Sequence, residues 1–234
     1  MQSVNTPSQR ASLSNATGAE DRPTIAIDIF HDTACPWCWI GKKHLFDAIA
    51  QWQGEAIQIR WHPFLLDDTI PPDGVDFRAF MTTRKKLKPE ELKQLFDSTR
   101  QSGEAAGLKL NFDKIQLAVN TKLSHRLIAL APENIKNTIV DAIYQAYFEQ
   151  GLNIGDIDTL VSLGQAAGMD ATQLRDRLSG DAALDAVIGQ STFARLNGIM
   201  SIPFFIFNSK FTVNGSHSVE IFYQALSSLI KHNS

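Results

Sequence analysis

The chain has only two cysteines in 234 residues, and both stand in one tetrapeptide, Cys35-Pro36-Trp37-Cys38. A disulfide across so short a loop restricts the unfolded chain far less than a long-range bridge does. The reducing cytosol also disfavours structural disulfides. A structural disulfide is therefore a poor explanation of the pair, and metal ligation or redox chemistry remains.

Positive charge is not in excess, because 22 Lys and Arg residues stand against 25 Asp and Glu residues, for a net charge of -3. Nucleic acids and anionic membranes are bound by concentrated positive charge, so we expect neither as a partner. No stretch approaches the roughly 18 apolar residues of a membrane span. Residues 1–22 are polar and lack the apolar core of a secretory signal. We interpret them as a disordered N-terminal tail and expect a cytoplasmic protein.

The first patterned region predicts a strand, a helix and a second strand. Residues 24–30 are rich in isoleucine on alternate positions, which is typical of a strand. Apolar residues at helical spacing predict a helix from 36 to about 52, with Pro36 in the first turn, where its missing N–H costs nothing. Residues 56–61 predict a strand that ends at His62-Pro63. A unit of this kind joins two parallel strands.

Between residues 75 and 197 the sequence contains no convincing strand and predicts a series of helices instead. They are expected at residues 75–86, 89–106, 121–131, 133–149, 156–167, 170–179 and 181–197. Strand character returns at 204–207 and 211–213, which form a predicted hairpin. A last helix is expected at 218–231.

This order, β-α-β, then helices, then β-β-α, predicts an α/β protein. Its expected fold is thioredoxin-like with a large all-helical insertion. The predicted divisions are 23–66 for the first part of the thioredoxin-like domain, 67–183 for the helical insertion subdomain and 184–234 for the second part.

The two cysteines open the first predicted helix, with Cys38 one turn after Cys35 on the same face. Thiols at such positions have pKa values lowered from about 8.5 to about 3.5–7.5 by the helix dipole and unpaired N–H groups. We therefore expect Cys35 to be the more exposed, attacking thiolate and Cys38 the resolving thiol. Pro36 and Trp37 would tune the thiolate by withholding one N–H and shaping the local field.

Two alternatives compete with the redox interpretation. Half a zinc site would need two further Cys or His ligands. The sequence has no second Cys pair, and its six histidines include no pair at zinc-finger spacing, so we expect no metal. An inert buried pair fits poorly with a motif that follows a strand and opens a helix.

Pro203 directly precedes the returning strand. In one interpretation it merely begins that strand, which is a permitted position for proline. In the other, Ile202-Pro203 is a cis bond that faces the cysteines and leaves the Ile202 backbone free to pair with an extended substrate segment.

Two further residues are secondary candidates. Asp32 either accepts a proton or holds the active-site turn by an Asx-type hydrogen bond, and the turn role is favoured. His125 lies on an expected insertion helix that would cover the active site. It could transfer protons near pH 7, although a satisfied structural histidine is the favoured interpretation.

Several motifs together resemble the DsbA-like oxidoreductases, and within them the FrnE-type branch. The matching segments are Asp32 to Lys42 (DTACPWCWIGK), Trp61 to Leu65 (WHPFL), Asn120-Thr121 with His125-Arg126-Leu127, Tyr147-Phe148 with Ile154 to Asp158, and Ile202 to Phe205 (IPFF). They follow the family's order and span about residues 24 to 230. The resemblance thus covers nearly the whole chain and is more specific than a lone C-x-x-C.

The resemblance implies a thioredoxin fold with a helical insert, a cis proline at Pro203 and disulfide exchange through Cys35 and Cys38. The related 2-hydroxychromene-2-carboxylate isomerases and kappa-class glutathione transferases carry serine where this chain has Cys35, which favours redox work here. Ser201 departs from the glycine usual in the family, beside the expected substrate groove.

We therefore predict a dithiol–disulfide oxidoreductase that acts on protein or peptide thiols and disulfides, without a bound cofactor and as a monomer or homodimer. One alternative is a glutathione-dependent isomerase or transferase, with glutathione as co-substrate. Another is a redox-responsive binding protein whose client binding changes with the thiol state.

Overall fold

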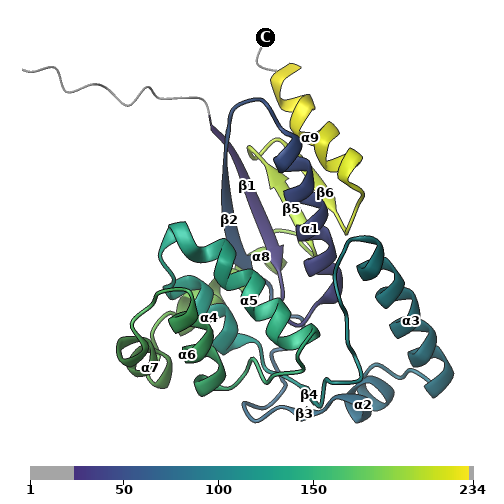
Figure 1. Ribbon diagram of the computed structural model, residues 1–234, viewed down its shortest axis with the longest axis vertical. Coiled ribbons are helices and arrows are strands. Elements are labelled where there is room, and N and C mark those ends of the chain that lie inside the picture. The colour runs from purple at the N-terminus through teal and green to yellow at the C-terminus, as the bar shows by residue number, and fades with distance from the viewer. Residues whose placement is uncertain (1–23, 232–234) are drawn as a thin grey trace, which may run out of the picture.

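The structure, a computed structural model, describes residues 24–231 (Figure 1). The tail predicted at 1–22 lies outside the described residues. Within the part of the chain that is described, no helix combines the length and the apolar character needed to cross a bilayer.

The predicted strand–helix–strand unit is confirmed. Strand β1 (Thr24–His31) and strand β2 (Ala56–Pro63) pair in parallel, and helix α1 (Pro36–Gln51) connects them. The predicted end of the second strand at residue 61 is wrong, because His62 and Pro63 continue the pairing opposite Phe30 and His31. The ring of His62 also stacks on that of Phe30, with centroids 4.7 Å apart.

The chain returns to the sheet as the predicted hairpin of β5 (Phe204–Phe207) and β6 (Phe211–Asn214), and the strand order is β2-β1-β5-β6. The connection has three residues, of which Asn208 and Ser209 have left-handed φ values of 48° and 56°, and the Lys210 N–H donates to the Phe207 carbonyl at 2.9 Å. The last helix, α9 (Val219–Lys231), packs beside α1 (Figure 1). Apolar side chains of both helices and of β1 and β5 form one core, which contains Ile25, Ile27, Ile29, Leu45, Ala48, Phe205, Phe207, Phe222, Leu226 and Leu229.

Between β2 and β5 the chain is mainly helical, as predicted. Its elements are β3 (Val75–Asp76), α2 (Phe77–Ala79), η1 (Phe80–Arg84), α3 (Pro89–Ala105), β4 (Leu117–Ala118), α4 (Lys122–Leu130), η2 (Glu133–Ile135), α5 (Lys136–Phe148), α6 (Ile157–Ala166), α7 (Ala171–Ser179) and α8 (Leu184–Leu196). The expectation of no strand is wrong, because β3 and β4 pair as a two-residue antiparallel ladder. Segments that short carry no alternation for a pattern to reveal.

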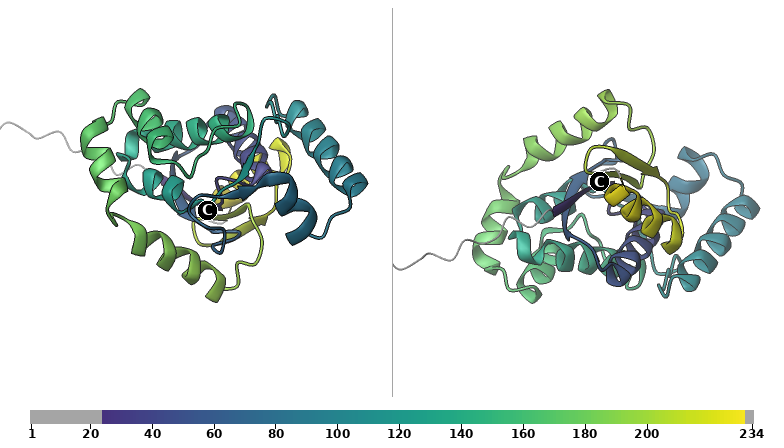
Figure 2. Two further views of the ribbon diagram at one scale, coloured as in Figure 1. Left: turned by 90° about the horizontal axis from the view of Figure 1, so that it is seen from below. Right: turned by 90° about the horizontal axis from the view of Figure 1, so that it is seen from above.

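The helix predicted at 75–86 is also wrong in form. It consists of the short helix α2 followed by one π-helical stretch, η1. Figures 1 and 2 show α3 on one side of the central sheet and α4 to α7 on the other. Helix α8 contacts both α4 and β2.

Stacked aromatic rings join the insertion to α1. Trp39 of α1 stacks on Tyr144 and Phe148 of α5, with centroids 5.9 and 6.0 Å apart. The Phe148 ring meets the ring of Phe112 edge-on. Phe112 in turn stacks on Phe96 of α3, with ring centroids 4.6 Å apart. The second core of the protein is thus built around the first turns of α1, where the cysteines lie.

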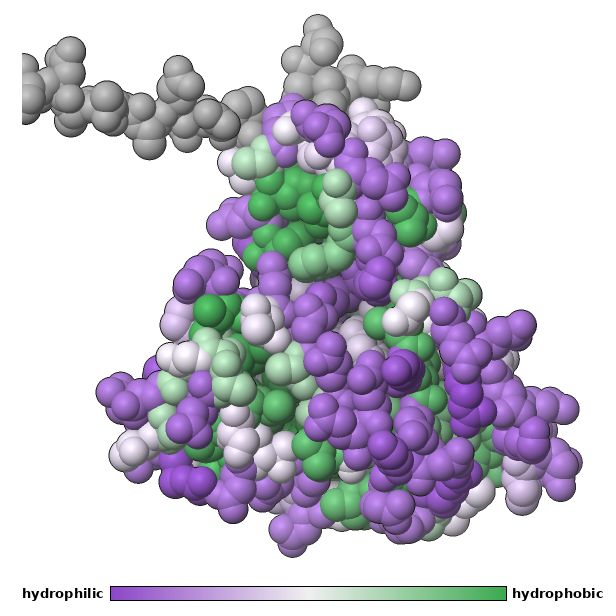
Figure 3. Space-filling view, viewed as in Figure 1, coloured by the Kyte–Doolittle hydropathy of each residue, from purple (hydrophilic) through white to green (hydrophobic). Residues whose placement is uncertain are grey.

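One face of the molecule keeps apolar side chains near the surface. Strand β2 is an edge strand, and its Ile57 and Ile59 are only half-buried. Figure 3 shows hydrophobic side chains gathered over the upper part of the sheet, where β1 and β2 lie in Figure 1.

Two glycines with the same backbone conformation allow the packing of the insertion to be tested. Gly151 and Gly107 have φ values of 73° and 76°. A Cβ at Gly151 would overlap the carbonyl oxygen of Lys114, whereas one at Gly107 would meet nothing within 4 Å. We expect both alanine variants to lose about 1 kcal/mol of unfolding free energy from the left-handed conformation. Gly151→Ala should lose about 2 kcal/mol more from the overlap. Urea unfolding of both variants measures this, and equal losses would contradict the structure.

Candidate functional site

Cys35 is the N-cap residue of α1, and Pro36 is the first residue of the helix, as the sequence predicted. The Cys35 N–H donates to the carbonyl oxygen of Asp32 at 3.1 Å, and the Cys35 carbonyl accepts from the Cys38 N–H, also at 3.1 Å. Among residues 24–231 no side chain caps this helix end. The sulfur of Cys35 therefore stands at the positive end of the helix dipole.

Both cysteines are free thiols in the structure, and both are largely buried. Cys35 is 7% exposed and Cys38 is 2% exposed. Cys35 is thus the more exposed of the two, as expected. Most of its surface is nevertheless covered, and it lines a cavity whose wall comes largely from the insertion. Trp37, 37% exposed, lies at the edge of the same cavity.

The environment of Cys38 keeps this thiol protonated. Burial raises its pKa well above the usual value, and the hydrogen bond and negative charge of Cys35 raise it further. The two cysteine side chains therefore lie near each other at the start of α1. Cys35 lines the cavity, whereas Cys38 does not line it and stays protonated.

Asp32 ties three segments together behind the cysteines. One oxygen of its buried carboxylate accepts the N–H of Ala34 at 2.9 Å, which is an Asx turn. The other accepts the N–H of Leu66 at 2.7 Å and the hydroxyl of Thr121 at 3.3 Å. Burial raises the pKa of Asp32, and these hydrogen bonds oppose the rise.

Tyr144 and His31 are polar residues near the site that the sequence analysis missed. The Tyr144 hydroxyl lies 2.8 Å from Nδ1 of His31 and 3.4 Å from the carbonyl oxygen of Asp32. Burial, followed by the charges of Cys38 and Cys35, raises the pKa of Tyr144 well above its usual range. The periodicity around Tyr144 marks a buried helix face, and nothing local shows which polar groups that face meets.

His125 does not line the cavity at Cys35. It lines a second cavity of about 150 Å³, with His31, Trp61 and residues of α4 and α8. Burial lowers the pKa of His125 from 6.5 to about 3, so its imidazole is neutral at pH 7. Among the residues described, neither Nε2 of His125 nor Nε2 of His31 has a hydrogen-bond partner.

The bond between Ile202 and Pro203 is cis. Pro203 is buried against α1 at Gly41, where an added Cβ would lie 3.0 Å from the proline ring. Ile202 packs against the core cluster that contains both cysteines. The structure thus places this pair beside the helix that the cysteines open, although neither residue lines the cavity at Cys35.

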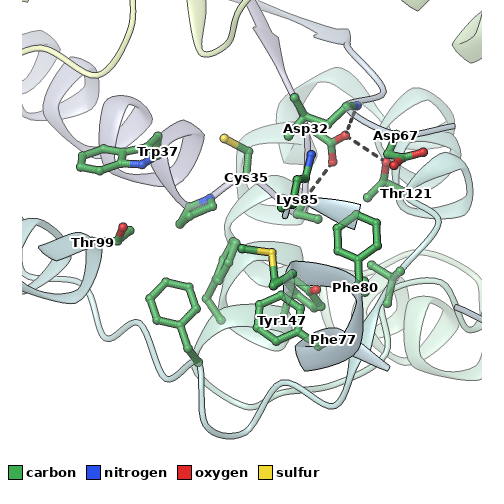
Figure 4. Close-up of a pocket in the computed structure, with 18 of the residues that line it drawn as sticks. Asp32, Cys35, Trp37, Asp67, Phe77, Phe80, Lys85, Thr99, Thr121 and Tyr147 are labelled. Atoms are coloured by element: carbon green, nitrogen blue, oxygen red, sulfur yellow. Dashed lines mark hydrogen bonds between the residues drawn. The ribbon is translucent and has the colours of Figure 1, made fainter. Parts of the chain in front are cut away.

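The cavity at Cys35 has a volume of about 500 Å³, in the range of small-molecule sites. Figure 4 shows Cys35, Trp37 and Asp32 on one side of it and Phe77, Phe80 and Tyr147 on another. Its apolar wall contains Leu66, Ile70, Phe77, Phe80, Met81, Leu87, Leu95, Phe96, Phe112, Ala118, Val119 and Phe148. The sequence analysis did not foresee this cavity, because its wall residues are scattered along the chain and each looks like ordinary core.

Across residues 24–231 no group of three or more His, Cys, Asp or Glu side chains is placed to hold a metal ion. The arrangement at Cys35 combines a thiol at a helix N-terminus, a second thiol near it and a largely apolar cavity in front.

Comparisons with known proteins give the same picture. Residues 26–227 match the model of the DSBA-like thioredoxin domain family. A curated relative, the uncharacterised protein YwbO of Bacillus subtilis, is 26% identical over 208 residues, which cover 87% of this chain and 96% of the relative.

Solved structures are similar over nearly their full length. The structure of a probable DsbA oxidoreductase from Streptomyces coelicolor is 27% identical, with a TM-score of 0.80 over 87% of this chain and 89% of that one. The cytosolic disulfide reductase DsbM of Pseudomonas aeruginosa, solved with GSH, is 16% identical (TM-score 0.61; 88% and 99% covered). A 2-hydroxychromene-2-carboxylate isomerase is 15% identical (TM-score 0.65; 89% and 97% covered). The last two show a common fold, and the predicted fold class is confirmed.

The buried imidazole of His125 should make stability depend on pH. In the unfolded chain histidine binds a proton near pH 6.5, but folded His125 stays neutral down to about pH 3. The unfolded state therefore takes up more protons between these values. This proton uptake by the unfolded state lowers the free energy of unfolding as the pH falls, by up to about 1.4 kcal/mol per pH unit.

The variant His125→Phe should lack this contribution. Denaturant unfolding at several pH values between 7 and 4 should give a shallower decline for the variant than for the wild type. Parallel curves would show that His125 is protonated in the folded protein.

Proposed function

The chain belongs to the family of DSBA-like thioredoxin domains, and on this basis we propose that it exchanges disulfides through Cys35 and Cys38 with thiol partners, among them peptides. One observation carries the proposal: Cys35 caps the N-terminus of α1, lines a ligand-sized cavity and lies near Cys38, whose N–H donates to the Cys35 carbonyl. Thiols at helix N-termini are good nucleophiles, because the dipole and the N–H groups stabilise the thiolate.

The exchange proceeds in two balanced steps. The Cys35 thiolate attacks one sulfur of the substrate disulfide, and the other substrate sulfur leaves as a thiolate, which accepts a proton. Cys38 then gives up its proton and attacks the sulfur of Cys35, so the second substrate thiol is released. The enzyme pair is oxidised by two electrons and the substrate is reduced by two. The reverse sequence oxidises a dithiol.

The raised pKa of Cys38 supports this order of events. A protonated Cys38 does not compete for the substrate, and it reacts only with a disulfide formed on the neighbouring sulfur. Asp32 acts as a positioning residue, because its carboxylate fixes Ala34 in the turn before Cys35.

The alternative is a glutathione-dependent isomerase. It draws on the fold shared with 2-hydroxychromene-2-carboxylate isomerase and on the GSH in the DsbM structure. Such an enzyme would not need a resolving thiol, so its activity would survive replacement of both cysteines. A redox-responsive binding protein would bind clients without turnover.

The two cysteines can be tested separately by insulin reduction with dithiothreitol. Cys35→Ser should lose activity to the uncatalysed level, a loss of at least about a hundredfold, because the nucleophile is gone. Cys38→Ser should still attack but not resolve, so when the reduced variant is mixed with insulin in the absence of dithiothreitol, a mixed disulfide between Cys35 and the substrate should accumulate and be visible by mass spectrometry.

Full activity of Cys35→Ser would refute the proposal. Turnover of a small electrophile with glutathione by the double variant would establish the isomerase alternative. Insulin binding that changes with the redox state, without reduction, would establish the binding protein.

A further inference from the structure

The cavity at Cys35 is lined mostly by apolar side chains. Its wall combines aromatic and aliphatic side chains from α2, η1, α3, the segment before β4 and α5. Its rim is partly apolar too, because Trp37, Leu66 and Leu95 line it and keep 37 to 45% of their surface exposed. An apolar ligand bound there would remove this apolar surface from water, which is favourable.

The polar side chains of the wall are already engaged. Thr99 donates its hydroxyl to the carbonyl of Leu95, and Tyr147 donates to the carbonyl of Leu117. Asp67 pairs with Arg84 at 3.0 Å.

Asp32 and Thr121, the remaining oxygen-bearing side chains of the wall, bond each other. Lys85 is the one cationic side chain among the described residues that line the cavity, and its ammonium lies 5.6 Å from the Phe80 ring. Glutathione carries two carboxylates, an ammonium group and two peptide groups, so binding it here would leave most of them without a side-chain partner.

We propose that this cavity selects compact apolar disulfides and thiols, above all aromatic ones, over glutathione. The inference rests on the proposed function, because it assigns a substrate class to the same two cysteines. One substituent of the disulfide fills the space between α3 and α5, which places its sulfur against Cys35. The exchange then follows the two steps given above, and two apolar thiols leave while the cysteine pair becomes a disulfide.

Three symmetrical disulfides, each compared with a simple reference thiol, separate selection by the cavity from intrinsic reactivity. Reduced enzyme should be oxidised by dibenzyl disulfide at least about tenfold faster than by bis(2-hydroxyethyl) disulfide or glutathione disulfide. Each rate is divided by that of N-acetylcysteine with the same reagent. Equal ratios for the three disulfides would overturn the inference.

A matched pair of leucine variants tests the wall. Leu95→Lys puts a charge on the cavity rim, whereas Leu196→Lys puts one on α8, at a residue that is 82% exposed and outside the cavity. Leu95→Lys should lower the ratio of the dibenzyl rate to the rate of the uncharged bis(2-hydroxyethyl) disulfide about tenfold. Leu196→Lys should leave this ratio unchanged. An unchanged ratio in Leu95→Lys would also overturn the inference.

A binding measurement keeps this inference separate from the redox proposal. Dibenzyl sulfide has no exchangeable bond, and calorimetry with the Cys35→Ser protein measures its binding without chemistry. Binding that Leu95→Lys weakens, together with no exchange by the wild type, would refute the redox function and keep the apolar site. Exchange without any binding of the sulfide would refute the site and keep the redox function.

Discussion

The carboxylate of Asp32 is the constraint on which the site depends. It lies at the end of β1, and it accepts hydrogen bonds from the turn that leads to Cys35, from the chain just after β2 and from Thr121 beside α4. Burying a carboxylate is costly unless such donors surround it. Asp32 therefore links β1, the segment after β2 and the insertion through hydrogen bonds, and these bonds fix the start of α1.

The stacked aromatic rings also hold the start of α1 in place. Trp39 lies directly after Cys38, and its ring rests on Tyr144 and Phe148. Because these rings belong to the insertion, the insertion fixes the helix that carries the cysteines and also covers them. The burial of Cys35 follows from this arrangement, and so does the cavity in front of its sulfur.

The sequence sufficed for the features that depend on neighbours in the chain. The turn at Cys35 was predicted from the strand before it and from the helical pattern after it, in which Pro36 occupies the first turn. The strand that follows Pro203 was predicted from the residues around that proline. The sequence could not show the burial of Cys35 or the cavity, because Phe77, Phe112 and Phe148 meet only in three dimensions. His125 was placed correctly on a helix, but its neighbours, His31 among them, come from other elements.

The wall of the cavity and the sulfurs come from separate stretches of sequence. The cysteines belong to the β-α-β unit, whereas the apolar wall is drawn largely from residues 66 to 148. Substitutions in that stretch can reshape the chamber while the dipole and the turn at Cys35 stay as they are. One reactive centre can in this way be inherited unchanged by descendants that accept different molecules, and a protein engineer could retarget it by the same route.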